Sequence, residues 1–316
     1  MTGPSIEISG LTKRFGSFVA LDGLQLKLEG AKCVGFLGPN GAGKTTALKL
    51  LTDMIFPTAG ECFINGISVQ QRRKVALADA GTLIESPEIY PSLTPVQALE
   101  MVADLRGVPV RERDSRIHEV LAEVKMSDWA DKRFGKFSKG MKQRINIAAA
   151  LVHDPEVVIL DEPATGLDPR GMAEVREIVR GLKKRNRLIF MSSHILQEVT
   201  DVCDEVALID HGKLLFYDTL SNVTSRFGGG HAPLDVGFAA PADMDAVTKK
   251  IGTLPGIESC TVLDPRRVRV KFSGDLAARE ELLRSLAGLR IGIISLSEAE
   301  GLLEEIYLKE ISRGDS

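Results

Sequence analysis

The sequence predicts an α/β fold with a parallel central sheet, followed by a small α+β domain. Three observations predict it. A glycine-rich loop at residues 38–45 lies between a short apolar run, residues 33–37, and a helical pattern over residues 47–51. A second apolar run, residues 157–160, has the composition of a central parallel strand and ends in two acids. Strand and helix patterns alternate again after a glycine run near residue 228.

The composition is that of an ordinary globular protein. The 316 residues are 44% apolar and 26% charged, and the net charge of −3 gives the whole chain no basic footprint for nucleic acid. The four cysteines form no Cys-x-x-Cys pair, so neither a zinc site nor a disulfide framework is expected. The N-terminus has no signal pattern, and no run approaches ~18 apolar residues. If the protein functions at a membrane, we therefore expect a partner protein to span the bilayer.

The glycine-rich loop fits the phosphate-loop pattern, in which two spaced glycines precede a lysine and a hydroxyl residue. Glycine lets the backbone curl so that successive N–H groups point at a polyphosphate, and the helix beginning near Lys44 adds the positive end of its dipole. Lys44 can reach the β- and γ-phosphates, and Thr45 can offer its hydroxyl to Mg²⁺. The loop comprises Gly38, Pro39, Asn40, Gly41, Ala42, Gly43, Lys44 and Thr45.

Residues 6–8 and 24–28 alternate apolar and polar side chains, which predicts half-solvated antiparallel strands. Residues 11–15 are expected in a loop between them that ends at Gly16. Phe15 in that loop could stack on a purine base, or Phe15 or Phe18 could simply cover the sheet. The spacing leaves both interpretations open.

Two strands and a helical region are expected next. Residues 60–66 predict a strand closing on an Asn-Gly turn, and residues 81–84 predict another strand. Thr94, Pro95 and Gln97 are typical of a helix start, and residues 94–134 are expected to be helical with a break at residues 107–109. This helical region is a candidate docking surface, or it serves stability alone.

Two acids follow one predicted central strand, and a histidine follows another. Asp161 and Glu162 follow residues 157–160, where doubly wound sheets bind ligands, so Asp161 can hold Mg²⁺ and Glu162 can orient or deprotonate a water. His194 follows a predicted strand at residues 188–191 and could contact a phosphate. Ser138 and Gly140 open a helix predicted to reach residue 153, which by itself is a weak signal for an anion site.

The last part of the chain predicts a ferredoxin-like domain. Strands are expected at residues 234–238, 257–263, 268–272 and 291–296, and helices at 243–251, 276–286 and 299–310, in βαββαβ order with a terminal helix. We expect domains at residues 1–225 and 232–316 with a linker at 226–231. Arg266, Arg267 and Arg269 are expected on a solvated strand face, and the domain shows no catalytic constellation.

The order of these segments resembles the nucleotide-binding subunit of an ATP-binding-cassette (ABC) transporter over residues 5 to about 225. The resemblance implies an ABC ATPase of the P-loop NTPase fold, with an antiparallel β-subdomain and a helical subdomain at about residues 86–140. It depends on five motifs in order. They are the phosphate loop, a signature at residues 137–141, a Walker-B strand ending at Asp161 and Glu162, a D-loop at residues 166–168, and the switch histidine His194.

The resemblance also implies the residues that contact nucleotide. Two chains would form a head-to-tail, ATP-induced homodimer that buries two ATP molecules, each held by Lys44 and Thr45 of one chain and by Ser138 and Gly140 of the other. Phe15 would stack on adenine, Thr46 would contact a phosphate, and Asp168 would communicate across the dimer. Glu162, His194 and Lys44 would be catalytic, with Mg²⁺ bound by Thr45 and Asp161.

Three positions depart from the family pattern. Glu85 replaces a glutamine that contacts Mg²⁺ or the attacking water, as in bacteriocin and bacitracin self-protection exporters. A carboxylate can bind Mg²⁺ but cannot donate when ionised, so we expect Glu85 to slow hydrolysis or to tighten its dependence on closure. Lys139 replaces a signature glycine and either strengthens phosphate binding or points to solvent. Met141 replaces the usual signature glutamine, and nothing in the sequence explains this replacement.

The expected function is an ATPase subunit that powers a separate integral membrane permease, at the cytoplasmic face of the membrane. The C-terminal domain resembles those of ABC-2 type exporters of drugs, antibiotics, peptides or lipid-like cargo. Two alternatives are a soluble ABC ATPase acting on nucleic acid, and a nucleotide sensor without hydrolysis. The acidic charge and the lack of heptads count against the first, and Glu162 counts against the second. No nucleic-acid partner is expected.

Overall fold

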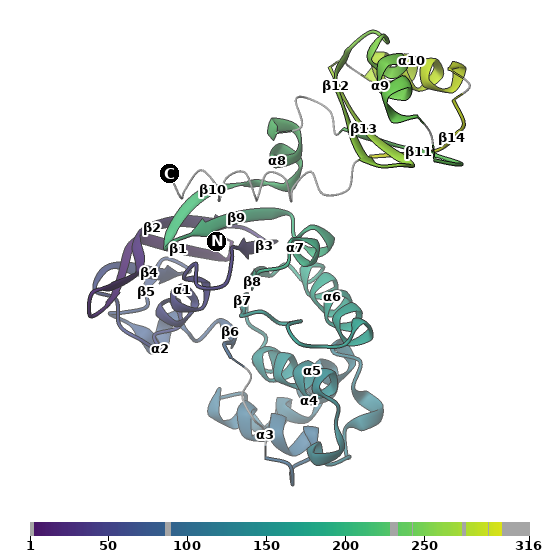
Figure 1. The fold of residues 1–316 in the computed structure, drawn as a ribbon. Coiled ribbons are helices and arrows are strands. Elements are labelled where there is room, and N and C mark those ends of the chain that lie inside the picture. The colour runs from purple at the N-terminus through teal and green to yellow at the C-terminus, as the bar shows by residue number, and fades with distance from the viewer. Residues whose placement is uncertain are drawn as a thin grey trace. The chain divides into compact units, whose positions relative to one another are not determined.

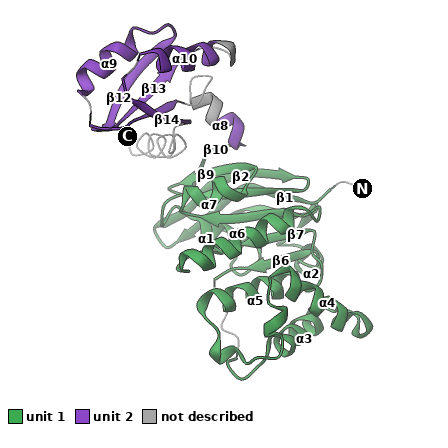
Figure 2. Cartoon of the chain, turned by 90° about the vertical axis from the view of Figure 1, so that its right-hand side faces the viewer, with its two compact units in different colours: residues 1–218 green, residues 219–316 purple. Residues whose placement is uncertain are grey.

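The computed structural model describes residues 3–85, 90–227, 233–241, 243–273, 276–289 and 291–298. They form two units, residues 1–218 and 219–316, coloured green and purple in Figure 2. Each unit has a hydrophobic core of its own. The linker expected at residues 226–231 lies mostly outside the described residues, and the helix expected at 299–310 lies entirely outside them.

Unit 1 begins with an antiparallel sheet. Strands β1 (Ser5–Phe15), β2 (Phe18–Glu29), β4 (Ala59–Ile64) and β5 (Ile67–Ser68) are arranged in the order β2-β1-β4-β5. The predicted alternation is confirmed in residues 24–28, where the leucines are buried and Gln25 and Lys27 are exposed. Asn65 and Gly66 have φ angles of 51° and 73°, as the predicted hairpin turn requires.

The predicted loop over residues 11–15 is wrong. These residues continue β1 to Phe15, which pairs with Phe18 across a tight turn. The pairing of β1 with β2 shifts register between Ile8 and Arg14, and Gly10 has a φ of 56°. Such bulges interrupt the period-2 alternation that marks a strand in the sequence.

The central sheet has the order β10-β9-β3-β8-β7-β6 (Figure 1). The pairs β9/β3, β3/β8, β8/β7 and β7/β6 are parallel, so their carboxyl ends share one edge. The strands are β3 (Lys32–Leu37), β6 (Ala80–Leu83), β7 (Val157–Leu160), β8 (Leu188–Ser193), β9 (Glu205–Asp210) and β10 (Lys213–Thr219). All residues of β7 and β8 are buried, as predicted for central strands.

Helices cover this sheet and form a separate helical region. Beside the central sheet lie α6 (Pro169–Lys183) and α7 (Leu196–Val202). Helices α1 (Lys44–Leu51) and α2 (Arg73–Ala76) contact strands of the antiparallel sheet, β2 and β4 for α1 and β5 for α2. At the end of unit 1 opposite β1 and β2 lie α3 (Pro95–Leu105), α4 (Val110–Glu123), α5 (Lys139–Leu151) and the short helices η1 (Ser127–Trp129) and η2 (Phe134–Lys136) (Figures 1 and 2). The predicted start of α3 is confirmed, because Thr94 and Gln97 form a capping box.

Unit 2 has the element order predicted for a ferredoxin-like domain. After α8 (Leu220–Phe227) come β11 (Leu234–Phe238), α9 (Met244–Gly252), β12 (Ile257–Asp264), β13 (Arg267–Phe272), α10 (Leu276–Gly288) and β14 (Ile293–Glu298). The antiparallel order β12-β13-β11-β14 places the first and third strands at the centre. Arg269 is mostly buried and binds Asp235 at 2.8 Å, so it is less solvated than the sequence suggested.

Within the described residues, none of the helices has both the length and the apolar character that crossing a membrane requires.

Candidate functional site

The phosphate loop connects the end of β3 to the start of α1. Gly43 is the N-cap of α1 with a φ of 104°, and Gly41 has a φ of 87°. A side chain at Gly38 would lie 2.3 Å from the Ile209 carbonyl oxygen, and one at Gly43 would lie 2.6 Å from that of Ala20. Since neighbouring backbone packs directly on these two glycines, the shape of the loop is set by the fold itself.

Lys44 lies inside the loop. Its side chain is only 4% exposed, and its ammonium donates to the carbonyl oxygens of Gly38 at 2.8 Å and Pro39 at 3.0 Å. Burial lowers the pKa of Lys44, while the charges of Glu162 and Asp161 oppose that shift. The buried ammonium is thus held by backbone oxygens at the mouth of α1, where an anionic ligand would compensate its charge.

Asp161 lies at an oxygen-rich corner beside the loop. Its Oδ1 accepts hydrogen bonds from the hydroxyls of Ser192 at 2.6 Å and Thr45 at 3.3 Å. Asp161 directly follows β7, Ser192 lies near the end of β8 and Thr45 lies in the first turn of α1. These three elements meet at the carboxyl edge of the sheet. Hydroxyl and carboxylate oxygens are the donors that Mg²⁺ prefers.

Glu162 adopts a strained backbone conformation next to Lys44 and His194. Its φ is 43°, and its N–H donates to Ser192 Oγ at 2.9 Å. One carboxylate oxygen lies 3.7 Å from Lys44 Nζ. The other accepts from Thr165 at 2.8 Å and lies 3.2 Å from His194 Nδ1, without hydrogen-bond geometry. A carboxylate held beside a lysine and an imidazole can accept a proton from a water.

Ser138 and Asp168 act as helix caps. The Ser138 hydroxyl accepts from the Met141 N–H at 3.2 Å at the start of α5, and Asp168 Oδ1 accepts from the Gly171 N–H at 3.0 Å at the start of α6. Both line a cavity of about 480 Å³ together with Gly140 and Met141. No residue of the phosphate loop lines this cavity, so within one chain these groups and the loop do not share a pocket.

Lys139 packs within its own chain. A Cβ placed on Gly166 would lie 2.4 Å from the Lys139 ammonium, so this side chain covers the glycine that precedes Leu167 and Asp168. Gly166 has a φ of 70°, a conformation that favours glycine.

Phe15 lies at the tip of the β1–β2 hairpin, and Glu85 lies just after β6. Phe15 and Phe18 end β1 and begin β2, and both rings are more than half exposed. The Lys13 ammonium lies 4.9 Å from the centroid of the Phe15 ring. Glu85 follows β6 with a φ of 56° and binds the Lys49 ammonium at 2.6 Å.

The structure therefore brings together Lys44, Thr45, Asp161, Glu162 and His194. Ser138, Gly140 and Asp168 line a cavity that the phosphate loop does not share. In the part of the chain that the structure describes, no group of three or more His, Cys, Asp or Glu side chains forms a metal cage. Thr45 and Asp161 fit Mg²⁺ as oxygen donors, provided that phosphate or water oxygens supply the other ligands.

Three polar residues at this site were not predicted from the sequence. Ser192 supports both Asp161 and the backbone of Glu162, Thr165 binds the Glu162 carboxylate, and Lys49 binds Glu85. Thr165 could have been found, because it lies three residues after Glu162 on a turn. Ser192 and Lys49 carry no local signal, since their contacts join distant segments.

The family profile and several similar sequences indicate the same protein family. The sequence profile of the family described as "ABC transporter" matches residues 21–165. A bacitracin transport ATP-binding protein of Bacillus licheniformis is 43% identical over 66% of this chain and 68% of its own. One from Enterococcus faecalis is 32% identical over 98% and 97%, and a daunorubicin resistance ATP-binding protein of Streptomyces coeruleorubidus is 30% identical over 98% and 96%.

Solved structures agree on the fold. The ATP-binding subunit of an ABC transporter superposes with a TM-score of 0.63 and 27% identity, covering 71% of this chain and 93% of that one. A dimeric ATP-binding cassette bound to ADP and phosphate superposes with a TM-score of 0.61 over 68% of this chain and 98% of that one, and at 21% identity it supports the fold alone.

Proposed function

The chain belongs to the ABC transporter family, and we propose that two copies of it close head to tail on two ATP molecules. The chain is an export-type ATP-hydrolysing subunit that powers a membrane permease. In each site, the phosphate loop of one copy would hold the triphosphate, and Ser138 and Gly140 of the other copy would cover the γ-phosphate. The support is that the helix start at Ser138 and the phosphate loop both have the character of anion sites but do not share a cavity within one chain.

The contacts of Glu162 support its role as the general base. The carboxylate would take a proton from water as the water oxygen bonds to the γ-phosphorus, and the bond to the bridging oxygen breaks to release ADP and phosphate. Lys44 would stabilise the charge that develops on the phosphate oxygens, and His194 would hold the water or the phosphate in place. Thr165 and the Ser192 hydroxyl fix the carboxylate and the backbone of Glu162, so its orientation precedes binding.

The remaining contacts extend this proposal. Mg²⁺ would be held by Thr45 and Asp161, with Glu85 nearby, and when bound it screens the phosphate charge. Phe15 would stack on adenine from the exposed hairpin tip, Thr46 would contact a phosphate through the first turn of α1, and Asp168 would transmit closure between copies. Lys139 would act within its own chain, because its ammonium packs against Gly166 at the start of the segment that carries Asp168.

The relatives point to the transported class. Three relatives are ATP-binding proteins for bacitracin transport, linearmycin resistance and daunorubicin resistance. Their names suggest that this subunit works with a permease that exports an antibiotic-like or peptide cargo. We place it peripherally on the cytoplasmic side of the membrane, through that permease. Co-purification with a membrane protein after mild detergent extraction tests this association.

The hydrolysis itself is tested with purified protein. Lys44→Ala should abolish ATP binding and turnover, because it removes the buried ammonium from the loop. Glu162→Gln should bind ATP normally but hydrolyse it at least ~100-fold more slowly, since the amide cannot accept the proton. Full hydrolysis by Glu162→Gln would show that another group is the base.

A further inference from the structure

Three carboxylates lie at the carboxyl edge of two neighbouring strands. Leu83 of β6 pairs with Leu160 of β7, and the Asp161 N–H donates to the Leu83 carbonyl oxygen at 2.8 Å. Glu85 therefore follows β6 at the position that Glu162 occupies after β7. Both glutamates have a positive φ, 56° and 43°, so the chain turns sharply at each. A third negative charge thus borders the site where we place a triphosphate.

Helix α1 supplies one polar partner to each of these carboxylates. The Lys44 ammonium lies 3.7 Å from Glu162, the Thr45 hydroxyl 3.3 Å from Asp161, and the Lys49 ammonium 2.6 Å from Glu85. Lys49 follows Thr45 by four residues, so the two side chains lie one turn apart on one face of the helix. Lys49 therefore holds Glu85 one helical turn from the Thr45–Asp161 corner.

The Lys49–Glu85 pair has little to do with fold stability. The Lys49 side chain is 26% exposed and that of Glu85 is 63% exposed, and ion pairs this open to water contribute little to the free energy of unfolding. The pair acts on the site through its charges, because an unpaired carboxylate one helical turn from the Thr45–Asp161 corner would repel a triphosphate bound there.

We propose that Lys49 is a positioning residue for ATP hydrolysis, which offsets the charge of Glu85 and holds its carboxylate away from the γ-phosphate. This inference rests on the proposed function. It predicts that ATP hydrolysis depends on Lys49 only while residue 85 carries a charge.

A double-mutant cycle tests the inference by steady-state ATPase kinetics of the purified full chain in MgATP. Lys49→Met should lower kcat/KM on the order of tenfold, which is typical of a lost supporting contact. Glu85→Gln should hydrolyse at least as fast as the parent, and Lys49→Met in the Glu85→Gln background should lose less than about threefold. Lys49→Arg, which keeps the charge, should stay within about threefold of the parent.

Lys183→Met is the matched control. Lys183 binds Asp204 at the same distance of 2.6 Å with similar exposure, 30% and 43%, on α6. It should leave kcat and KM unchanged, and all variants should keep the parent melting temperature.

Two results would overturn the inference: parent-like kinetics of Lys49→Met, or an equal loss in both Glu85 backgrounds. A parent chain without Lys44-dependent hydrolysis would instead contradict the proposed function.

Discussion

Ser192 shows how one buried hydroxyl can organise the acids at the site. It is fully buried at the end of β8, donates to Asp161 and accepts from the N–H of Glu162. Without that acceptor, the backbone of Glu162 would lose a partner at a residue whose φ of 43° is already strained.

Ser192→Ala should therefore lower kcat by about 10- to 100-fold, the range typical for residues that orient a ligand or a base. ATP affinity should change less, since the phosphate loop is untouched. Steady-state kinetics and a fluorescent nucleotide titration check this. A variant whose kcat matches the parent would show that Asp161 and Glu162 are oriented without Ser192.

His153 makes the stability of unit 1 depend on pH. Burial lowers the pKa of His153 to about 4, with the nearby Arg106 charge acting in the same direction. The folded pKa is thus below the value of about 6.5 in the unfolded chain. Between those values the unfolded chain binds a proton that the folded chain does not, so the free energy of unfolding falls as the pH drops from 6.5 towards 4.

This loss should amount to about 2–3 kcal/mol at pH 4, after allowance for partial exposure. Urea unfolding of the full chain and of His153→Gln at several pH values measures it. The variant should show a flatter dependence over this range. An identical slope in both proteins would mean that other groups cause the acid sensitivity.

Residue-scale prediction from the sequence worked where the chemistry is local. The phosphate loop could be recognised because its glycines, lysine and threonine are consecutive, and the capping box at Thr94 is equally local. The roles of Ser192 and Lys49 could not be predicted, since each contacts an acid more than thirty residues away in the chain. Such partners are fixed by strand order, which residue patterns do not encode.

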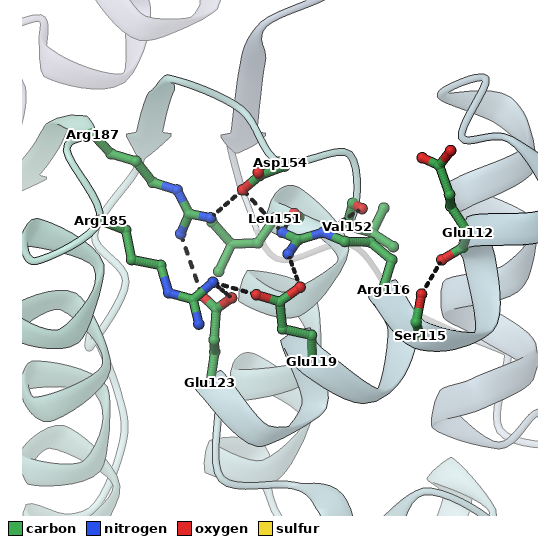
Figure 3. A network of polar contacts seen from close by, with 10 residues as sticks. All are labelled: Glu112, Ser115, Arg116, Glu119, Glu123, Leu151, Val152, Asp154, Arg185 and Arg187. Carbon is green, nitrogen blue, oxygen red and sulfur yellow. Dashed lines mark hydrogen bonds and ion pairs between the residues drawn. The ribbon is translucent and has the colours of Figure 1, made fainter.

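At the scale of elements, an arginine network joins the helical region to the central sheet (Figure 3). Arg116 and Glu119 of α4 bind each other, and Arg116 also donates to the carbonyl oxygens of Leu151 and Val152 at the end of α5. Arg187, just before β8, binds Glu123 of α4 at 3.2 Å and Asp154 at 2.7 Å. The segment leading into β8, whose carboxyl end borders the proposed site, is thereby attached to α4.

Arg187→Met should destabilise unit 1 by about 2–3 kcal/mol, because it removes a guanidinium that is 3% exposed and leaves the buried Glu123 with one partner fewer. Partial burial raises the pKa of Asp154, but the hydrogen bond from Arg187 and the charges of Arg116, Arg187 and Arg185 together outweigh that effect and hold the pKa below its usual value. Chemical unfolding measures the change.

Arg185→Met provides the control, since Arg185 also binds Glu123 but is 42% exposed. It should cost less than about 1 kcal/mol. Equal losses for both arginines would contradict a role for burial in this network.

Element-scale prediction from the sequence succeeded for strands and helices with a clear period. Residues 157–160 and 188–191 lie in central strands, and residues 24–28 alternate as a half-buried strand should. It failed at residues 11–15, where bulges in β1 disturb the alternation over a long hairpin. The helix predicted to reach residue 153 ends at Leu151, within the usual uncertainty of helix ends.

At the scale of the whole molecule, the sequence indicated an ATPase followed by a βαββαβ domain, and the structure divides the chain near residue 218. A single chain presents two halves of the proposed sites: the phosphate loop with its acids, and the Ser138 cavity, which no residue of that loop lines. The second copy could not be inferred from residue patterns alone, because they describe one chain.

The mass of the Glu162→Gln variant in solution tests the shared site most directly. Light scattering with Mg²⁺ should give the 34.3 kDa monomer without ATP and twice that mass with it, because ATP that is not hydrolysed keeps two copies closed. Adding Ser138→Arg should abolish the doubling, since the arginine would fill the surface that covers the γ-phosphate. A mass that ATP does not change, or a doubling that survives Ser138→Arg, would contradict the account.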